Sequence, residues 1–203
     1  MSSKDLEEVL HVAVAEAADT MDRLHRVPMM FKFVLPDGLT FKLDEDRITS
    51  IGCDLGSEAH KDRLSDMVRD MAAFLNVDYY VHYSESWVVT RTSEDVDAQE
   101  KSGRPFVMPR NDPRRFECVH YVAESKTHLI FARQGIIRPA GKEPRVNPED
   151  LSIDIVERGE GGRTEYRGRF IGVLGKKLST ERFNHIAKIM KDVMSEMEGE
   201  TNG

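Results

Sequence analysis

The segment around Pro36-Asp37-Gly38 constrains the fold more than any other part of this sequence. Apolar residues alternate with other residues on both sides of it, at 31–35 before the turn and at 39–43 after it. Alternation with a period of two is the pattern of a strand with two different faces, and Pro-Asp-Gly favours a tight turn. The sequence therefore predicts a β-hairpin. One of its faces must be covered by another element, because it carries Phe31, Phe33 and Phe41.

Three segments have the apolar spacing of amphipathic helices. Residues 5–26 repeat apolar residues at steps of three and four, namely Leu6, Leu10, Val14, Ala17, Met21 and Leu24. Residues 58–75, with Ser57 as a plausible N-cap, and residues 180–197 have the same spacing. We expect the apolar stripe of the first helix to pack on the sheet and to cover the phenylalanine face of the hairpin. A dimer contact through that stripe is the alternative.

The remaining strands are predicted at 79–90, 116–124, 127–133, 151–156 and 164–174, the last two joined by the glycine-rich turn 159–162. A series of strands flanked by helices, without regular alternation, is typical of an α+β fold. We expect a largely antiparallel sheet with an N-terminal, a central and a C-terminal helix packed on it. The 203 residues fit one domain, with a possible subdomain boundary near residue 50 and a disordered tail at 199–203.

Charge and composition exclude several classes of protein. The formal net charge of -7 argues against general nucleic-acid binding, because an acidic chain repels phosphates. The two cysteines, Cys53 and Cys118, are too few for a disulfide framework or a zinc site, and we expect no metal or other cofactor. The charged N-terminus has no secretory signal and no segment is apolar enough to span a membrane, so the expected location is the cytoplasm.

The strands at 79–90 and 116–124 repeat a short Val-His-Tyr pattern and carry the candidate catalytic residues, His82, Glu85, His120 and Glu124. Alternation places Glu85 on the apolar face of its strand, where it must sit at a bulge, reach the sheet edge or pair with an arginine. A carboxylate of raised pKa in that place could act as a general acid or base. The same alternation puts His82 on a polar face and His120 on a core face, which disfavours a shared site.

The connection at 91–115 is longer than most loops, and loops of that length are often functional. Its first half is acidic, and its second half contains Arg104, Arg110, Arg114 and Arg115. These arginines could hold a phosphate or a carboxylate-bearing partner. Alternatively, they could fold back on the acidic half of the same segment.

Residues 172–180 resemble a phosphate-binding loop only superficially. Walker spacing requires glycine at position 170, which is Phe170, and Ser or Thr at position 177, which is Lys177. No serine-hydrolase or cysteine-histidine motif is present either. The sequence therefore gives no diagnostic catalytic motif.

The segment 68–131 contains the motifs Ser84-Glu85-Ser86-Trp87 and Asp112-Pro113-Arg114-Arg115, followed by Glu117. In these motifs it resembles a family of small uncharacterised bacterial and phage proteins. The resemblance implies no activity. It does imply that the strand containing Trp87 pairs with the strand that begins at Phe116, and it makes a phage origin conceivable.

Three functional hypotheses follow. The leading one is a non-enzymatic binding or regulatory protein that engages a protein or a small anionic ligand through the segment 91–115. The second is a hydrolase that uses Glu85 together with His82, His120 or Glu124. The third is a structural or assembly protein that forms homo-oligomers through the helix stripes.

Overall fold

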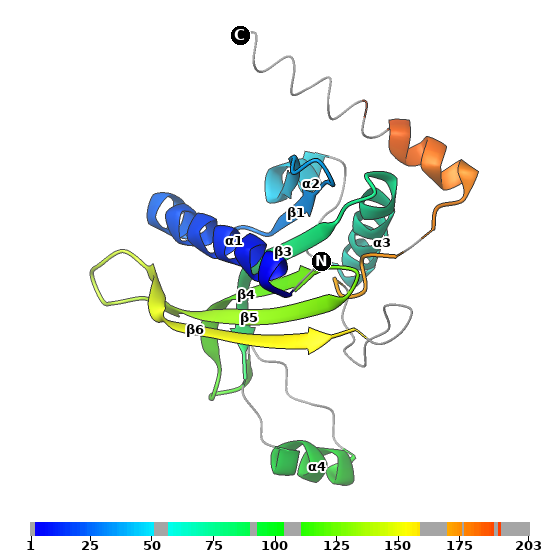
Figure 1. Cartoon of the computed structure of the whole chain (residues 1–203). Coiled ribbons are helices and arrows are strands. Elements are labelled where there is room, and N and C mark those ends of the chain that lie inside the picture. Colours follow the sequence, from blue (N-terminus) through cyan, green and yellow to red (C-terminus); the bar gives the residue numbers. More distant parts are fainter. Residues whose placement is uncertain are drawn as a thin grey trace.

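A computed structural model describes residues 3–50, 57–89, 93–103, 111–158, 170–175, 177–188 and 191 of the chain. The predicted α+β fold is confirmed: six strands form one antiparallel sheet in the order β2-β1-β3-β4-β5-β6 (Figure 1). The strands are β1 (Met30–Val34), β2 (Thr40–Asp44), β3 (Tyr79–Val88), β4 (Phe116–Glu124), β5 (His128–Ile137) and β6 (Arg145–Glu157). The helices are α1 (Ser3–Leu24), α2 (Glu45–Ser50), α3 (Glu58–Phe74) and α4 (Ser93–Ser102), followed by a C-terminal helix at residues 180–188.

Helix α1 packs on one face of the sheet, as its apolar spacing predicts. Its fully buried residues are Leu6, Leu10, Ala13, Ala17 and Met21. They form one core with residues of β3, β4 and β5, among them Val81, Tyr83, Tyr121, Ala123 and Ile130. No described helix has the length and the apolar character needed to cross a membrane.

The predicted hairpin is β1 and β2, but α1 does not cover its phenylalanine face. Phe31 and Phe33 belong to a second core on the opposite face of the sheet, which they share with α3, α2 and the C-terminal helix. Helix α3 begins after Ser57, whose side chain accepts a hydrogen bond from the backbone N–H of His60 as the N-cap. The expectation failed because both faces of the hairpin are covered, and nearness in sequence does not determine which helix covers which face.

The face that α1 does cover carries two lysines of the hairpin. Lys32 is 3% exposed, and its Nζ lies 2.9 Å from Oε2 of Glu16 on α1. Lys42, its antiparallel partner, contacts the other oxygen of Glu16 at 3.0 Å. A buried lysine requires a carboxylate partner, and Glu16 supplies it.

Three other predictions are corrected. The acidic part of the connection 91–115 is helix α4, and Figure 1 shows it projecting away from the sheet. Residues 170–174 of the expected last strand form turns and bends, while 164–169 of that strand and the expected turn at 159–162 lie outside the described residues. Strand β6 begins at Arg145, ahead of the strand expected at 151–156, and it pairs with β5. The short helix α2 had no counterpart in the prediction.

Candidate functional site: a groove on the open half of the sheet

The four candidate catalytic residues lie on two faces of the sheet. Strands β3 and β4 pair as the family resemblance implies, with Tyr80 opposite Glu124, His82 opposite Val122 and Ser84 opposite His120. Antiparallel partners point to the same side of a sheet, so His82, His120 and Glu124 share a face. Glu85 pairs with Val119 and points to the other face, toward the α1 side. The structure therefore does not gather Glu85 with the other three.

The prediction that His82 and His120 occupy different faces is wrong. It treated an apolar composition as the mark of a single core face, but the sheet has a core on each side. His82 is 5% exposed, and its ring lies 4.7 Å from the ring of Phe31 and 4.7 Å from that of Phe170. Its Nδ1 lies 3.2 Å from the Met30 carbonyl oxygen, which fixes Nδ1 as the protonated nitrogen of the neutral ring. Burial lowers the pKa of His82 to about 3.

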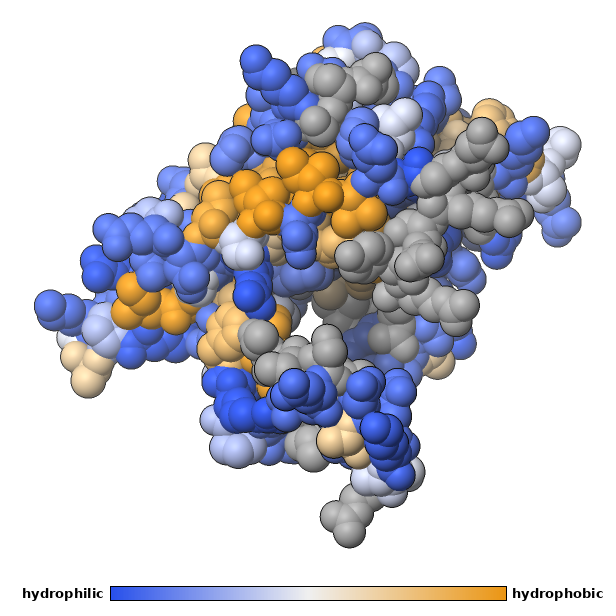
Figure 2. Space-filling view, turned by 60° about the horizontal axis from the view of Figure 1, so that its bottom comes forward, coloured by the Kyte–Doolittle hydropathy of each residue, from blue (hydrophilic) through white to orange (hydrophobic). Residues whose placement is uncertain are grey.

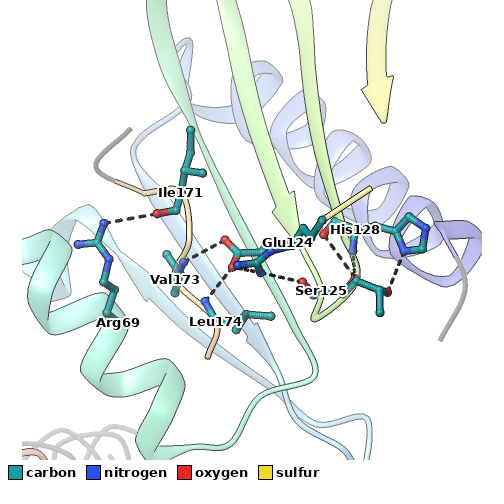
Figure 3. A network of polar contacts seen from close by, with 9 residues as sticks. Arg69, Glu124, Ser125, His128, Ile171, Val173 and Leu174 are labelled. Carbon is teal, nitrogen blue, oxygen red and sulfur yellow. Dashed lines mark hydrogen bonds and ion pairs between the residues drawn. The ribbon is translucent and has the colours of Figure 1, made fainter. Parts of the chain in front are cut away.

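Glu124 is fully buried and connects three segments of the chain (Figure 3). Its Oε1 accepts hydrogen bonds from Nη1 of Arg158 at 2.6 Å and from the backbone N–H of Leu174 at 2.8 Å. Its Oε2 accepts one from the backbone N–H of Val173 at 3.0 Å. The turn that presents these N–H groups contains Gly172 with φ of 69°, a conformation that glycine adopts without steric cost. Glu124 thus anchors the segment 173–174 to the end of β4.

Both oxygens of Glu85 are also held by neighbouring groups. Oε1 accepts a hydrogen bond from the backbone N–H of Val27 at 2.7 Å, and Oε2 lies 3.3 Å from Nη2 of Arg138. Arg138 donates as well to both oxygens of Glu117, at 2.6 Å and 2.8 Å. Burial raises the pKa of Glu85, while these donors oppose the shift. Pairing with an arginine was one of the three arrangements that the sequence allowed for this carboxylate.

The described arginines of the segment 91–115 contact residues of their own neighbourhood. Arg114 lies 3.2 Å from Asp95 of α4 and 3.3 Å from Asp112, and the hydrogen bond to Asp112 raises the pKa of Arg114. The guanidinium of Arg115 lies 4.9 Å from the ring centroid of Trp87, which fits a cation–π contact. Arg114 thus follows the second alternative, folding back on the acidic half. Arg104 and Arg110 lie outside the described residues.

A groove of about 330 Å³ opens on the face that carries His120. Its lining residues are Val88, His120, Phe131, Ala132, Arg133, Ser152 and Asp154. The register explains this set: His120 lies opposite Arg133, which lies opposite Ser152, so three strands contribute one row of side chains. Phe131 and Asp154 form the adjacent pair. Among the described residues, the α3-side core contains no residue of β4, β5 or β6, although Cys118, Val122 and Leu129 of the same face are buried, so the groove is a local opening on this half of the face.

The groove combines apolar surface with groups of different charge. Burial lowers the pKa of His120, so its imidazole is neutral near pH 7. The guanidinium of Arg133 lies 5.5 Å from the ring centroid of Phe116. Asp154 adds a carboxylate and Ser152 a hydroxyl on the exposed side of β6. Among the described residues, no group of three or more His, Cys, Asp and Glu side chains is placed to hold a metal ion.

Of the residues that line the groove, only His120 is a candidate functional residue on the sequence alone. Arg133, Ser152 and Asp154 are ordinary strand residues without a motif, and only the register of β4, β5 and β6 brings them together. The available signal was the alternation within 127–133 and 151–156, which places Arg133 on one face of its strand with Phe131, and Ser152 on one face of its strand with Asp154. Comparison of the chain with protein-family models, with curated proteins and with solved structures finds no match.

Proposed function

We propose that this protein is a non-enzymatic protein-binding module, and that its groove over β4, β5 and β6 receives side chains of a partner protein. One observation carries the proposal: this groove, with its mixed lining, lies on the part of the sheet face that α3 does not cover. The acidic and basic candidates elsewhere are engaged in the contacts that hold the fold together, namely Glu85 with Arg138, Glu124 with Arg158, and Arg114 with Asp95.

The character of the groove favours a protein over a small molecule. Small-molecule sites are concave and mostly apolar, and they enclose most of their ligand. Here the side chains of Val88 and Phe131 lie among four polar side chains, while that of Ala132 belongs to the α1-side core, and Ser152 and Asp154 are exposed. Such a mixture is typical of protein interfaces, whose apolar centres have polar rims. Figure 2 shows apolar areas set among hydrophilic residues on the side of the molecule that it displays.

The proposal is tested by filling the groove. Ser152→Trp places a large side chain over it from an exposed position, where the fold is least affected. Thr40→Trp, at an exposed position on the opposite edge strand β2, is the matched control. Proteins that co-purify with the wild type are quantified by mass spectrometry, and the best candidate is purified and titrated against each variant.

We expect Ser152→Trp to weaken binding of the purified partner at least about tenfold, which is about 1.4 kcal/mol. Thr40→Trp is expected to bind like the wild type. Equal binding by both variants and the wild type would rule the groove out as the contact surface. Circular dichroism and thermal melting of each variant separate a local effect from unfolding.

A further inference from the structure

Strand β6 forms the outer edge of the sheet beside the groove. It has 13 residues and pairs with β5 on one side, while no described strand pairs with it on the other. Every second backbone N–H and C=O group of an edge strand points away from the sheet and can accept another strand. The other edge, β2, has only 5 residues. Strand β6 therefore offers the longer template.

The second half of β6 lacks several of the usual protections of an edge strand. Natural edge strands are shielded by charged side chains, above all lysine, by proline or by a bulge. In β6 the proline is Pro148, and the irregularity in its pairing with β5 lies between Gln134 and Ile136, opposite the first half of the strand. From Leu151 to Glu157 the pairing with β5 is regular, and that segment contains no lysine and no proline. Ile155 in this segment is 45% exposed.

The charge of β6 indicates the chemistry of the strand that would fit. The strand has one basic residue, Arg145, and its acidic residues are Glu149, Asp150, Asp154 and Glu157. Opposite charges across a strand pair are favourable and like charges are unfavourable. A second copy of this chain would bring the same carboxylates to the contact. A basic segment matches the edge instead.

The position of the groove indicates which side chains of such a segment would be recognised on each face of the sheet. Ser152 and Asp154 belong both to the groove and to β6, so one face of an added strand would lie beside the groove. The alternate residues Leu151 and Ile153 pack on the α1-side core, so the other face would continue an apolar row. An added strand with basic residues alternating with apolar ones therefore complements both faces.

We propose that Leu151–Glu157 of β6 accepts a cationic extended segment of a partner polypeptide as a seventh strand, with its basic side chains beside Asp154 and the groove. This inference rests on the proposed protein-binding function and names the chemistry and the mode of that binding. Backbone hydrogen bonds supply the pairing, and the alternation of basic and apolar side chains supplies the selectivity.

The probe is the peptide acetyl-Lys-Val-Lys-Val-Lys-Val-Lys-amide, titrated into the full chain labelled with ¹⁵N. We expect amide shift changes centred on residues 151–157 and slower hydrogen exchange at alternate positions there. Two control peptides isolate the causes. In the first, methylation of alternate backbone nitrogens removes the hydrogen bonds to β6. In the second, replacing every lysine by glutamate reverses the charge of the peptide. Each change should weaken binding at least tenfold.

Variants of the protein test the same contact from the other side. Asp154→Lys is expected to weaken peptide binding at least tenfold, since it reverses the charge at the centre of the edge. Asp19→Lys makes the same charge change on α1, where the side chain is 70% exposed, and is expected to leave binding within twofold of the wild type. Equal weakening by both variants would mean that only net charge matters and would overturn the proposal.

Two further outcomes overturn it. Equal affinity of the methylated peptide shows that no strand is added. Slow exchange at alternate amides of 151–157 in the free protein at low concentration shows that the edge is already occupied by this chain itself.

If the peptide does not bind while Ser152→Trp still abolishes binding of a purified partner, the edge inference is wrong and the groove function stands. If both tests fail, both proposals are wrong.

Discussion

At the scale of single residues, Glu85 and Glu124 look like catalytic carboxylates in the sequence, but both oxygens of each have partners within the protein. Glu124 receives three hydrogen bonds while fully buried, and Arg158, its cationic partner, is itself only 5% exposed in its side chain. A buried ion pair is costly to break because the remaining charge is left without compensation. The burial and the partners of Glu124 are therefore explained by its role in anchoring the segment 173–174.

Replacing Glu124 should be among the most destabilising single substitutions in the described part of the chain. We expect Glu124→Ala to lower the free energy of unfolding by about 3–5 kcal/mol, because it removes the carboxylate that pairs with the buried Arg158 guanidinium and accepts the N–H groups of Val173 and Leu174. Glu124→Gln keeps the acceptor oxygen and should lie between the alanine variant and the wild type. Urea denaturation measures all three proteins.

The control is Glu143→Ala, at a side chain that is 77% exposed, with an expected change below about 0.5 kcal/mol. Hydrogen exchange at 173 and 174 should accelerate in Glu124→Ala, since their N–H groups lose the acceptor. A change as small as that of the control would contradict the anchoring role.

At the scale of elements, α1 and the hairpin are joined by an electrostatic contact within an otherwise apolar interface. Glu16 of α1 contacts both Lys32 and Lys42, and the Tyr83 hydroxyl donates a hydrogen bond to it at 3.4 Å. Burial opposes the ionisation of Glu16, but the hydrogen bonds and charges of the two lysines outweigh it and lower the pKa of this carboxyl. The contact fixes which face of the hairpin meets α1.

This contact predicts a particular dependence on pH. A carboxyl whose pKa is lower in the folded state stabilises the fold above its unfolded value of 4.5 and loses that contribution as the pH falls through the folded value. We therefore expect Glu16→Gln to be less stable than the wild type at pH 7 by about 1–3 kcal/mol. The difference should shrink toward pH 3, since protonation increasingly removes the charge of the wild-type carboxylate as the pH falls below 4.5.

Urea denaturation at both pH values checks this, with Asp19→Asn on the exposed side of α1 as the control. A difference between Glu16→Gln and the wild type that is unchanged from pH 7 to pH 3 would show that the loss comes from packing alone.

At the scale of the whole molecule, one sheet separates two cores, and coverage of its two faces differs. Helix α1 spans the sheet from β3 to β6, whereas the core beneath α3 ends before β4. On the face that α3 partly covers, the buried His82 lies beneath α3, and the groove lies over β4, β5 and β6. The same face of one strand pair thus carries a core residue, His82, and a groove residue, His120.

The buried histidine should make the whole fold sensitive to acid. The pKa of His82 is about 3 in the folded state against 6.5 for the free side chain, so the unfolded chain binds the additional proton between these values. Stability contributed by the neutral ring is present above about pH 6.5 and is lost as the pH falls toward 3. Glu85, whose pKa is raised, acts in the opposite direction above pH 4.5.

We expect His82→Asn to reduce the loss of unfolding free energy between pH 6.5 and pH 4 by up to about 1.4 kcal/mol per pH unit. His11→Asn, at an exposed position of α1, is the control and should leave the slope unchanged. Denaturation curves collected across this range give the slopes directly. Identical slopes for His82→Asn and the wild type would show that another group controls acid unfolding.

The sequence by itself determined the features that depend on local periodicity. The hairpin around Pro36-Asp37-Gly38, the apolar stripe of α1, the Ser57 cap and the antiparallel α+β class all follow from the spacing of apolar residues and from turn and cap chemistry. The residues that make up each of these signals lie close together in the chain, and so the signals can be recognised from the sequence alone.

Only the tertiary structure decided which side chains meet. The second core that encloses His82, the capture of 173–174 by Glu124 and the row from His120 to Arg133 and Ser152 each join segments far apart in sequence. Strand register and the choice of helix for each face set these contacts, and a shift of one residue would turn every side chain to the opposite face. The physical reason is that alternation defines two faces of a strand without saying what covers either one.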